Sequence, residues 1–161
     1  MLSRFLTRDK VVLEFGSGMS TVWYAKRAGK VVSIDNYRPW YDRVAAILQE
    51  RGLDNVDYRF AKDDGEYLRI PQDGPGYDLI MVDGSIRDRC TEAAIGRLNP
   101  GGIFYLDNSD RAAFSDSDEA QGARIALRHA RDHGCEVKYF TDFAPTNFFA
   151  QEGMMVIRPP A

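Results

Sequence analysis

The residues most able to do chemistry in this chain stand around a short glycine turn. Glu14 precedes the turn by two residues, and Gly16 and Gly18 provide backbone that can bend sharply and approach a ligand closely. Three consecutive apolar residues before Glu14 predict a buried strand, and Ser20 or Thr21 would cap the helix that follows. A carboxylate aimed at such a turn repels a pyrophosphate but favours a cation or the amine of an amino acid. The turn therefore predicts a ligand-binding crevice at the edge of an open α/β sheet.

A second carboxylate follows at a distance that one helix and one strand would span. The run Val31–Ile34 predicts another buried strand, and it ends at Asp35, 19 residues after Gly16. An acidic residue about 20 positions after such a turn accepts hydrogen bonds from ribose hydroxyls. A nicotinamide-dependent oxidoreductase is one alternative. Against it, Thr21 replaces the third glycine of the dinucleotide motif, and Glu14 would repel the pyrophosphate.

The pattern of an acid, one spacer and G-x-G, followed by an acid after the next strand, resembles the first motifs of the class I S-adenosylmethionine-dependent methyltransferases. The resemblance covers nearly the whole chain. It implies S-adenosylmethionine as the cofactor, with the turn and the first acid at its methionine end and the second acid at its ribose. The residues that carry this expectation are Glu14, Gly16, Ser17, Gly18 and Asp35.

A third acidic segment follows the expected strand Val56–Phe60. It resembles the family segment that touches the adenine, where an acid or amide accepts the exocyclic amine, and Asp63 aligns best with that position. The alternative is that Asp63 and Asp64 cap a short helix. Both roles are compatible with one side chain.

Two further strand ends carry hard oxygen ligands. Asp83 follows the expected strand Tyr77–Val82, and Asp107 and Asn108 follow Ile103–Leu106. Such oxygens suit Mg²⁺ or Ca²⁺, and the arrangement resembles the metal site of the catechol and caffeoyl-coenzyme-A O-methyltransferases. The resemblance implies Mg²⁺, which lowers the pKa of the acceptor hydroxyl. Alternatively, Asp107 and Asn108 form an Asx turn, and Asp83 contacts the cofactor or substrate without a metal.

The catalytic residues expected from this resemblance are Asp83 and Arg87. The lysine of the metal-dependent enzymes falls three residues after the first aspartate, where this chain has Ile86. Arg87 stays protonated and cannot act as a general base, but it can stabilise an oxyanion. The expected reaction is direct methyl displacement from the sulfonium by an acceptor oxygen or nitrogen. The acid and amide oxygens favour O-methylation of a small molecule.

The remaining pattern alternates strands and helices without repeats. It predicts one α/β domain over residues 1–161, with a Rossmann-like, mostly parallel seven-stranded sheet and one antiparallel strand near the C-terminus. The final strands, Val137–Phe143 and Met154–Ile157, would pair as a hairpin across a connection around Asn147–Gly153. Helices are expected at Tyr41–Arg51, Arg87–Leu98 and Glu119–Asp132.

The composition of the chain indicates which partners and which cell compartment to expect. A net charge of −3 argues against a nucleic-acid surface as the main function. The sequence shows no apolar run long enough to span a bilayer, and Met1–Lys10 is too short for a secretory signal. Cys90 and Cys135 lack C-x-x-C spacing and are expected as free thiols, which favours the cytoplasm.

The first expected strand begins at about residue 10, so little chain precedes it to cover a substrate. The substrate pocket would then be open or completed by another subunit, and we expect a monomer or a homodimer. The same feature leaves a second alternative, a non-catalytic module that binds S-adenosylmethionine for sensing or assembly.

Overall fold

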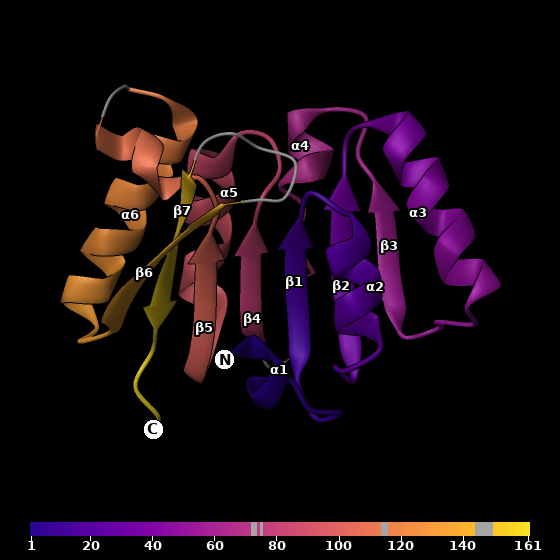
Figure 1. Cartoon of the computed structure of the whole chain (residues 1–161), viewed down its shortest axis with the longest axis horizontal. Helices are drawn as coiled ribbons and strands as arrows, with labels where there is room; N and C mark the ends of the chain where they lie inside the picture. The colour runs from indigo at the N-terminus through magenta and orange to yellow at the C-terminus, as the bar shows by residue number, and fades with distance from the viewer. Residues whose placement is uncertain (72–73, 75, 114–115, 144–149) are drawn as a thin grey trace.

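A computed structural model shows seven strands in one sheet with helices on both faces (Figure 1). It describes the chain except residues 72–73, 75, 114–115 and 144–149. The strand order is β3-β2-β1-β4-β5-β7-β6. The bounds are β1 Val11–Phe15, β2 Lys30–Asp35, β3 Val56–Phe60, β4 Tyr77–Val82, β5 Leu98–Leu106, β6 Glu136–Phe143 and β7 Ala150–Ile157.

The pairings confirm the predicted topology. The pairs β1–β2, β2–β3, β1–β4 and β4–β5 are parallel, whereas β7 is antiparallel to both β5 and β6. The sheet is therefore mostly parallel, with one reversed strand near the C-terminus. Dinucleotide-binding sheets have the order 3-2-1-4-5-6. The inserted, reversed β7 departs from that order and counts against the nicotinamide alternative.

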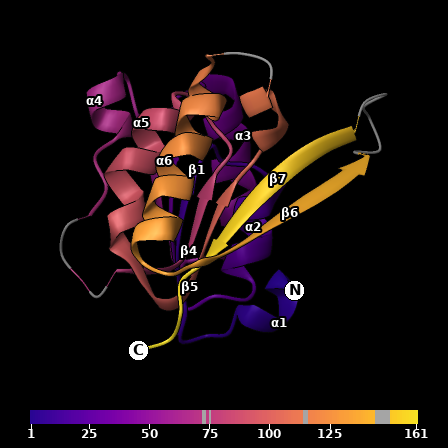
Figure 2. The ribbon, with the colours of Figure 1, turned by 90° about the vertical axis from the view of Figure 1, so that its left-hand side faces the viewer.

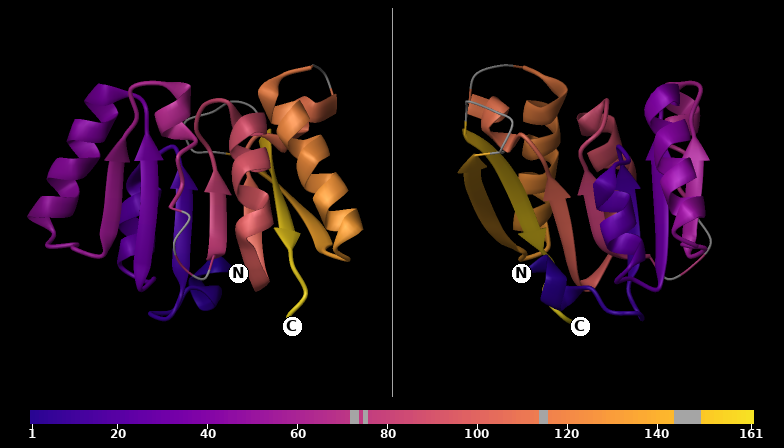
Figure 3. Two further views of the ribbon diagram at one scale, coloured as in Figure 1. Left: turned by 180° about the vertical axis from the view of Figure 1, so that it is seen from behind. Right: turned by 45° about the vertical axis from the view of Figure 1, so that its right-hand side comes forward.

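The helices form two layers, one on each face of the sheet (Figures 2 and 3). One layer consists of α1 Leu2–Phe5, α2 Met19–Ala25 and α3 Arg38–Glu50. The other consists of α4 Asp64–Tyr67, α5 Arg87–Ala94 and α6 Asp118–Asp132. Among the described residues, no helix is long and apolar enough to cross a membrane.

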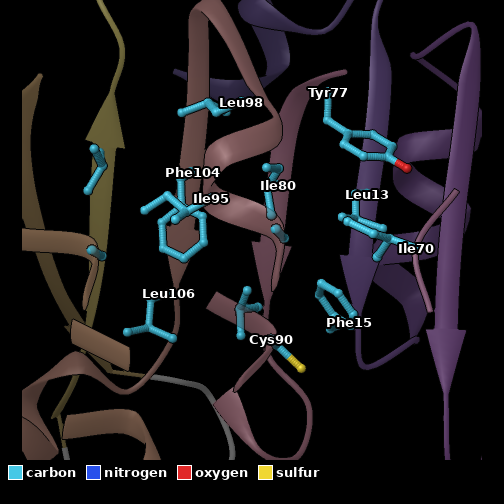
Figure 4. Close-up of a cluster of buried hydrophobic side chains, with 14 of the residues drawn as sticks. Leu13, Phe15, Ile70, Tyr77, Ile80, Cys90, Ile95, Leu98, Phe104 and Leu106 are labelled. Carbon is cyan, nitrogen blue, oxygen red and sulfur yellow. The ribbon is translucent and has the colours of Figure 1, made fainter. Parts of the chain in front are cut away.

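Alternating side chains of the central strands fill two cores, because successive strand residues point to opposite faces. Leu13 and Phe15 of β1 belong to the core under α4, α5 and α6, whereas Val12 belongs to the core under α1 and α2. Figure 4 shows the first of these cores, in which Cys90 of α5 lies among the strand side chains. Cys90 and Cys135 are both free thiols, as predicted. The two cores fix the sheet, and with it the strand ends.

Two boundaries differ from the prediction around the start of β5. Helix α5 ends at Ala94, and a 3-10 turn over Ile95–Arg97 follows it. Leu98 already pairs with Tyr77 as the first residue of β5, so the stretch 99–102 lies within the strand as an irregularity in register. The physical reason is burial: Leu98 is an apolar side chain with almost no exposure, and it packs in the core.

Three other elements also differ from the prediction. β7 begins at Ala150, so residues 150–153 pair with β6 and do not form a connection. Residues 147–149 of the predicted connection lie outside the described part of the chain. Helix α3 begins at Arg38, ahead of the predicted start, because Pro39 in its first turn favours helical backbone. The short helix α1 was not predicted.

Leu79→Ala should destabilise the fold by about 2–5 kcal/mol, because it removes a fully buried side chain between β1 and β5 and leaves a cavity. Leu127→Ala is the matched control on α6, where the leucine is 40% exposed. It should change the free energy of unfolding by no more than about 0.5 kcal/mol. Urea unfolding measures both, and similar effects of the two variants would contradict the assigned core.

Candidate active site

The ends of β1 and β4 meet at the carboxyl edge of the sheet. The backbone N–H of Asp83 donates to the Phe15 carbonyl at 2.9 Å, which continues the ladder beyond the strands. Gly16 has φ +87°, and a Cβ built on it would lie 2.7 Å from Gly84. Only glycine fits this close approach and this backbone conformation. The first glycine of the motif therefore allows the two turns to touch.

A polar pocket of about 460 Å³ opens beside this contact. Five of the residues predicted to bind the cofactor line it: Gly16, Ser17, Gly18, Asp35 and Asp83. Its other walls include residues that the motif analysis did not assign to the pocket, among them Tyr37 and Tyr67. The volume is typical of a small-molecule or cofactor site.

Glu14 lies beneath the turn and not among the residues that line the pocket. Its carboxyl is fully buried and accepts hydrogen bonds from the hydroxyls of Ser20 at 2.6 Å, Thr21 at 2.5 Å and Ser33 at 2.7 Å. Burial raises the pKa of Glu14 to about 7, although these three hydroxyls oppose the shift. The structure thus shows Glu14 holding α2 and β2 to β1, and its contact with a cofactor amine stays a prediction.

The predicted helix cap is confirmed only for Thr21, which accepts from the N-cap backbone in a capping box, whereas the N-cap itself is Gly18. Helix α2 begins at Met19 with Gly18 as its N-cap, so Ser20 and Thr21 lie in the first turn. The backbone N–H of Gly18 donates to the Thr21 hydroxyl at 3.0 Å, and that hydroxyl in turn donates to Glu14. The hydroxyls therefore serve the buried carboxyl, which a local cap pattern could not reveal.

Asp35 lines the pocket and organises the turn from the other side. Its Oδ2 accepts hydrogen bonds from the Ser17 backbone N–H at 2.8 Å and the Ser17 hydroxyl at 2.6 Å, and its Oδ1 accepts from the Tyr37 N–H at 2.8 Å. The indole N–H of Trp40 donates to the Ser17 carbonyl at 2.5 Å. The pocket thus has a carboxylate beside two aromatic side chains, a suitable setting for a ribose and a base.

Asp63 caps helix α4. Its Oδ1 accepts the backbone N–H of Glu66 at 2.8 Å, and Asp63 is not among the residues that line the pocket. The capping alternative is confirmed. An additional contact of Asp63 with adenine stays a prediction.

Tyr67 closes the floor of the pocket near Gly84. The side chain is fully buried, and a Cβ built on Gly84 would lie 1.9 Å from its hydroxyl. Tyr67 follows a helix cap and no motif marks it, so sequence reasoning missed it. The available clue was its place within the segment predicted to touch the adenine.

The predicted metal ligands do meet, but around a guanidinium. Arg87 Nη2 donates to Asp83 Oδ1 at 3.1 Å, while Nη1 donates to Asn108 Oδ1 at 3.0 Å and to the Asp107 carbonyl at 2.6 Å. Its Nε donates to the Gly84 carbonyl at 2.9 Å. Within the described residues, no three His, Cys, Asp or Glu side chains group as a metal site. The donor set therefore does not fit the predicted Mg²⁺ site, because two of its side-chain oxygens already bind Arg87.

The same contacts show that most of the Arg87 guanidinium is bound within the chain. Four of its five N–H groups already donate within the chain, and its side chain is only 11% exposed. One N–H of Nη2 is left over for a substrate, so direct stabilisation of an oxyanion by Arg87 stays a prediction. Asp83 remains accessible, with a side chain 51% exposed. Partial desolvation and the nearby Asp107 carboxylate raise the pKa of Asp83 to about 6, and Arg87 opposes this shift.

A second, mainly apolar pocket adjoins the first. It shares Met19 and Ser20 with the polar pocket, and its volume is about 640 Å³. Its walls include Trp23 of α2, Tyr105 of β5 and further apolar side chains from the N-terminal segment, β6 and β7. The polar and apolar pockets thus adjoin at the start of α2.

The arrangement of strands and helices matches a known fold. An O-methyltransferase of Streptomyces achromogenes involved in tomaymycin synthesis, solved in complex with S-adenosylmethionine, matches with a TM-score of 0.74. The match covers 94% of this chain and 74% of that protein at 20% identity. The chain has the class I methyltransferase fold.

Curated relatives with sequence similarity are also methyltransferases, although no known family model matches this chain. A protein-L-isoaspartate O-methyltransferase of Nitrobacter winogradskyi is 34% identical over 60% of this chain and 43% of its own length. An uncharacterised RNA methyltransferase of Caldanaerobacter subterraneus is 28% identical over 63% of this chain and 23% of its own length. The chain spans less than half the length of either relative, so their names do not identify its acceptor.

In this class I methyltransferase fold, Glu14→Gln should change how stability depends on pH. The folded pKa of Glu14 is raised from 4.5 to about 7, so its stabilising contribution is complete below pH 4.5 and is lost as pH rises through about 7. Glutamine does not titrate. Between pH 5 and pH 8, the variant should therefore gain stability relative to the wild type by up to about 3 kcal/mol.

Urea unfolding at both pH values measures this difference. Glu50→Gln is the control, because Glu50 is exposed at the end of α3, and it should follow the wild type at both pH values. Parallel stability curves for Glu14→Gln and the wild type would show that the buried carboxyl does not titrate in this range.

Proposed function

We propose that this chain is an S-adenosylmethionine-dependent methyltransferase that acts on a small-molecule acceptor, most simply by O-methylation. One observation carries the proposal: the glycine turn, Asp35 and Asp83 line one pocket at the carboxyl edge of a sheet with the class I methyltransferase order. This edge is where open α/β sheets bind their ligands. Bound there, S-adenosylmethionine supplies a methyl group on a positively charged sulfur.

Each end of the pocket suits a different part of the cofactor. Asp35 is buried and accepts only through its carboxylate, which suits ribose hydroxyls, and Trp40 and Tyr37 offer aromatic surface near a base. At the opposite end, Ser20 faces both the pocket and Glu14, so it can relay the charge of Glu14 to an amine. Gly16, Ser17 and Gly18 supply close backbone between these two ends.

The reaction needs alignment more than acid–base chemistry. Methyl transfer is a direct displacement, so catalysis depends on holding the acceptor atom in line with the sulfonium and on the charge around it. Asp83 lines the pocket and can accept a hydrogen bond from an acceptor hydroxyl or amine. No step of this proposal passes through a metal.

The adjoining apolar pocket supports a small-molecule acceptor. Its aromatic and methionine side chains favour an acceptor with an apolar body. The net charge of −3 does not favour a nucleic acid. The curated relatives' names nevertheless make an isoaspartyl peptide and an RNA the two comparison substrates.

The free thiols support a reducing, cytoplasmic setting, with the chain acting as a monomer or homodimer.

S-adenosylhomocysteine should bind and stabilise the fold, by about 2.7 kcal/mol at 100 times its dissociation constant. Asp35→Ala should weaken this binding at least tenfold by removing the acceptor of the ribose hydroxyls. Calorimetry gives the affinities, and unfolding without ligand verifies that the variant is folded. Asp57→Ala on β3 is the matched control, because Asp57 pairs with Arg59 and is not part of the pocket lining. Equal affinity of Asp35→Ala and wild type would remove Asp35 from the cofactor site.

Transfer of a labelled methyl group tests activity against the non-catalytic alternative. We expect turnover with a phenolic or other apolar hydroxyl acceptor, and none with an isoaspartyl peptide or RNA. Binding of S-adenosylhomocysteine without turnover on any acceptor class would favour a sensing or assembly module. Turnover on the peptide or RNA alone would overturn the small-molecule proposal while keeping the methyltransferase.

A further inference from the structure

We infer that Arg87 supplies from within the chain the positive charge that a divalent metal would supply at the acceptor edge, so that Asp83, Asp107 and Asn108 form a metal-independent site. Arg87 is then a positioning residue that acts through Asp83. The inference rests on the proposed function, because it concerns the acceptor end of the same pocket. It also opposes the metal site that the strand-end acids suggest in the sequence.

The guanidinium occupies the position that a shared cation would take. It contacts each of the three candidate ligands, two through side-chain oxygens and Asp107 through its carbonyl. The three come from the ends of β4 and β5, whereas Arg87 comes from the first turn of α5. One planar group with a fixed fork of donors thus joins two strand ends, as a metal ion would.

Arg87 carries a permanent charge that is mostly shielded from solvent. A guanidinium stays protonated at all relevant pH values, and this one is only 11% exposed. A divalent ion on the same oxygens would stand within a few ångströms of that charge and be repelled by it. The carboxylates of Asp83 and Asp107 therefore already have a cation between their strand ends.

The backbone at the start of α5 is built to deliver this side chain. Ile86 has φ +42°, a left-handed conformation that is rare for a β-branched residue and costs free energy. The next backbone N–H, that of Arg87, donates to Asp118 Oδ2 at 2.9 Å, which ties the turn to α6. The Arg87 side chain then folds back to the Gly84 carbonyl. The strain at Ile86 has its explanation in the fixed direction of Arg87.

The contact with Arg87 determines how Asp83 can bind an acceptor. With Oδ1 held by Arg87, the Asp83 carboxylate keeps one orientation at the pocket while its side chain remains half exposed. It can accept a hydrogen bond from a hydroxyl or an amine, so the site selects acceptors that carry a proton on the attacking atom. A chelating pair of acceptor oxygens is not required, in contrast to a metal-dependent site.

Mn²⁺ binding to the purified protein tests the inference without an acceptor. Calorimetry and electron paramagnetic resonance should detect no saturable Mn²⁺ binding by the wild type at millimolar metal. Arg87→Ala should bind Mn²⁺ at least tenfold more tightly than the wild type. Loss of the guanidinium frees oxygens of Asp83 and Asn108 beside the Asp107 carboxylate. The double variant Arg87→Ala/Asp83→Asn should lose the acquired binding.

Arg89→Ala is the matched control on the same helix, since Arg89 pairs with the exposed Asp64, and it should acquire no metal binding. Arg87→Lys keeps the charge and should also remain without Mn²⁺, which provides a folded variant if Arg87→Ala does not fold. Saturable one-to-one binding by the wild type that Asp83→Asn abolishes would overturn the inference, as would a folded Arg87→Ala that acquires none. S-adenosylhomocysteine binding, measured on the same samples, separately tests the proposed function.

Discussion

The pocket depends on one buried contact, the Glu14 carboxyl and its three hydroxyl partners. Glu14 belongs to β1, two of the hydroxyls belong to the first turn of α2, and the third belongs to β2. Burying a carboxyl is costly, and hydrogen bonds from all three neighbours offset much of that cost. Such a network is stable only when every member is in place. It therefore fixes the direction of α2 and the position of the glycine turn above it.

A second constraint is the contact between the two turns at the carboxyl edge. Gly16 and Gly84 approach so closely that neither tolerates a side chain, and this closeness places Asp83 beside the cofactor turn. The same edge then gathers acidic side chains from β2, β4 and β5. Like charges at one edge repel, and Arg87 places one cation against the Asp83 carboxylate and the main-chain carbonyl of Asp107. The Glu14 and Asp83 carboxyls are thus stabilised differently, by neutral hydroxyls and by a cation.

A shared fold does not determine the substrate. Proteins similar to this chain are named for tomaymycin synthesis, for protein L-isoaspartate and for RNA. Specificity in such folds lies in the side chains around the acceptor. In the proposed function, those are an arginine-held aspartate and an adjoining apolar pocket, and together they favour an acceptor with an apolar body.

The sequence alone determined the elements and the cofactor edge of this protein. Apolar runs, glycine turns and acid spacing are local signals. The apolar runs predicted β1, β3, β4 and the presence of the reversed β7, and the spacing of Glu14, Gly16 and Asp35 predicted the turn. Only the tertiary structure decided what those acids bind. Glu14 accepts hydrogen bonds from hydroxyls, Asp63 accepts one at a helix N-terminus, and Asp83 accepts one from the guanidinium of Arg87. The physical reason is that a hydrogen-bonding group takes its partner from whatever the packing places nearby. Arg87 lies 21 residues from Asn108 in the chain, and only the pairing of β4 with β5 and the left-handed turn at Ile86 bring the two together.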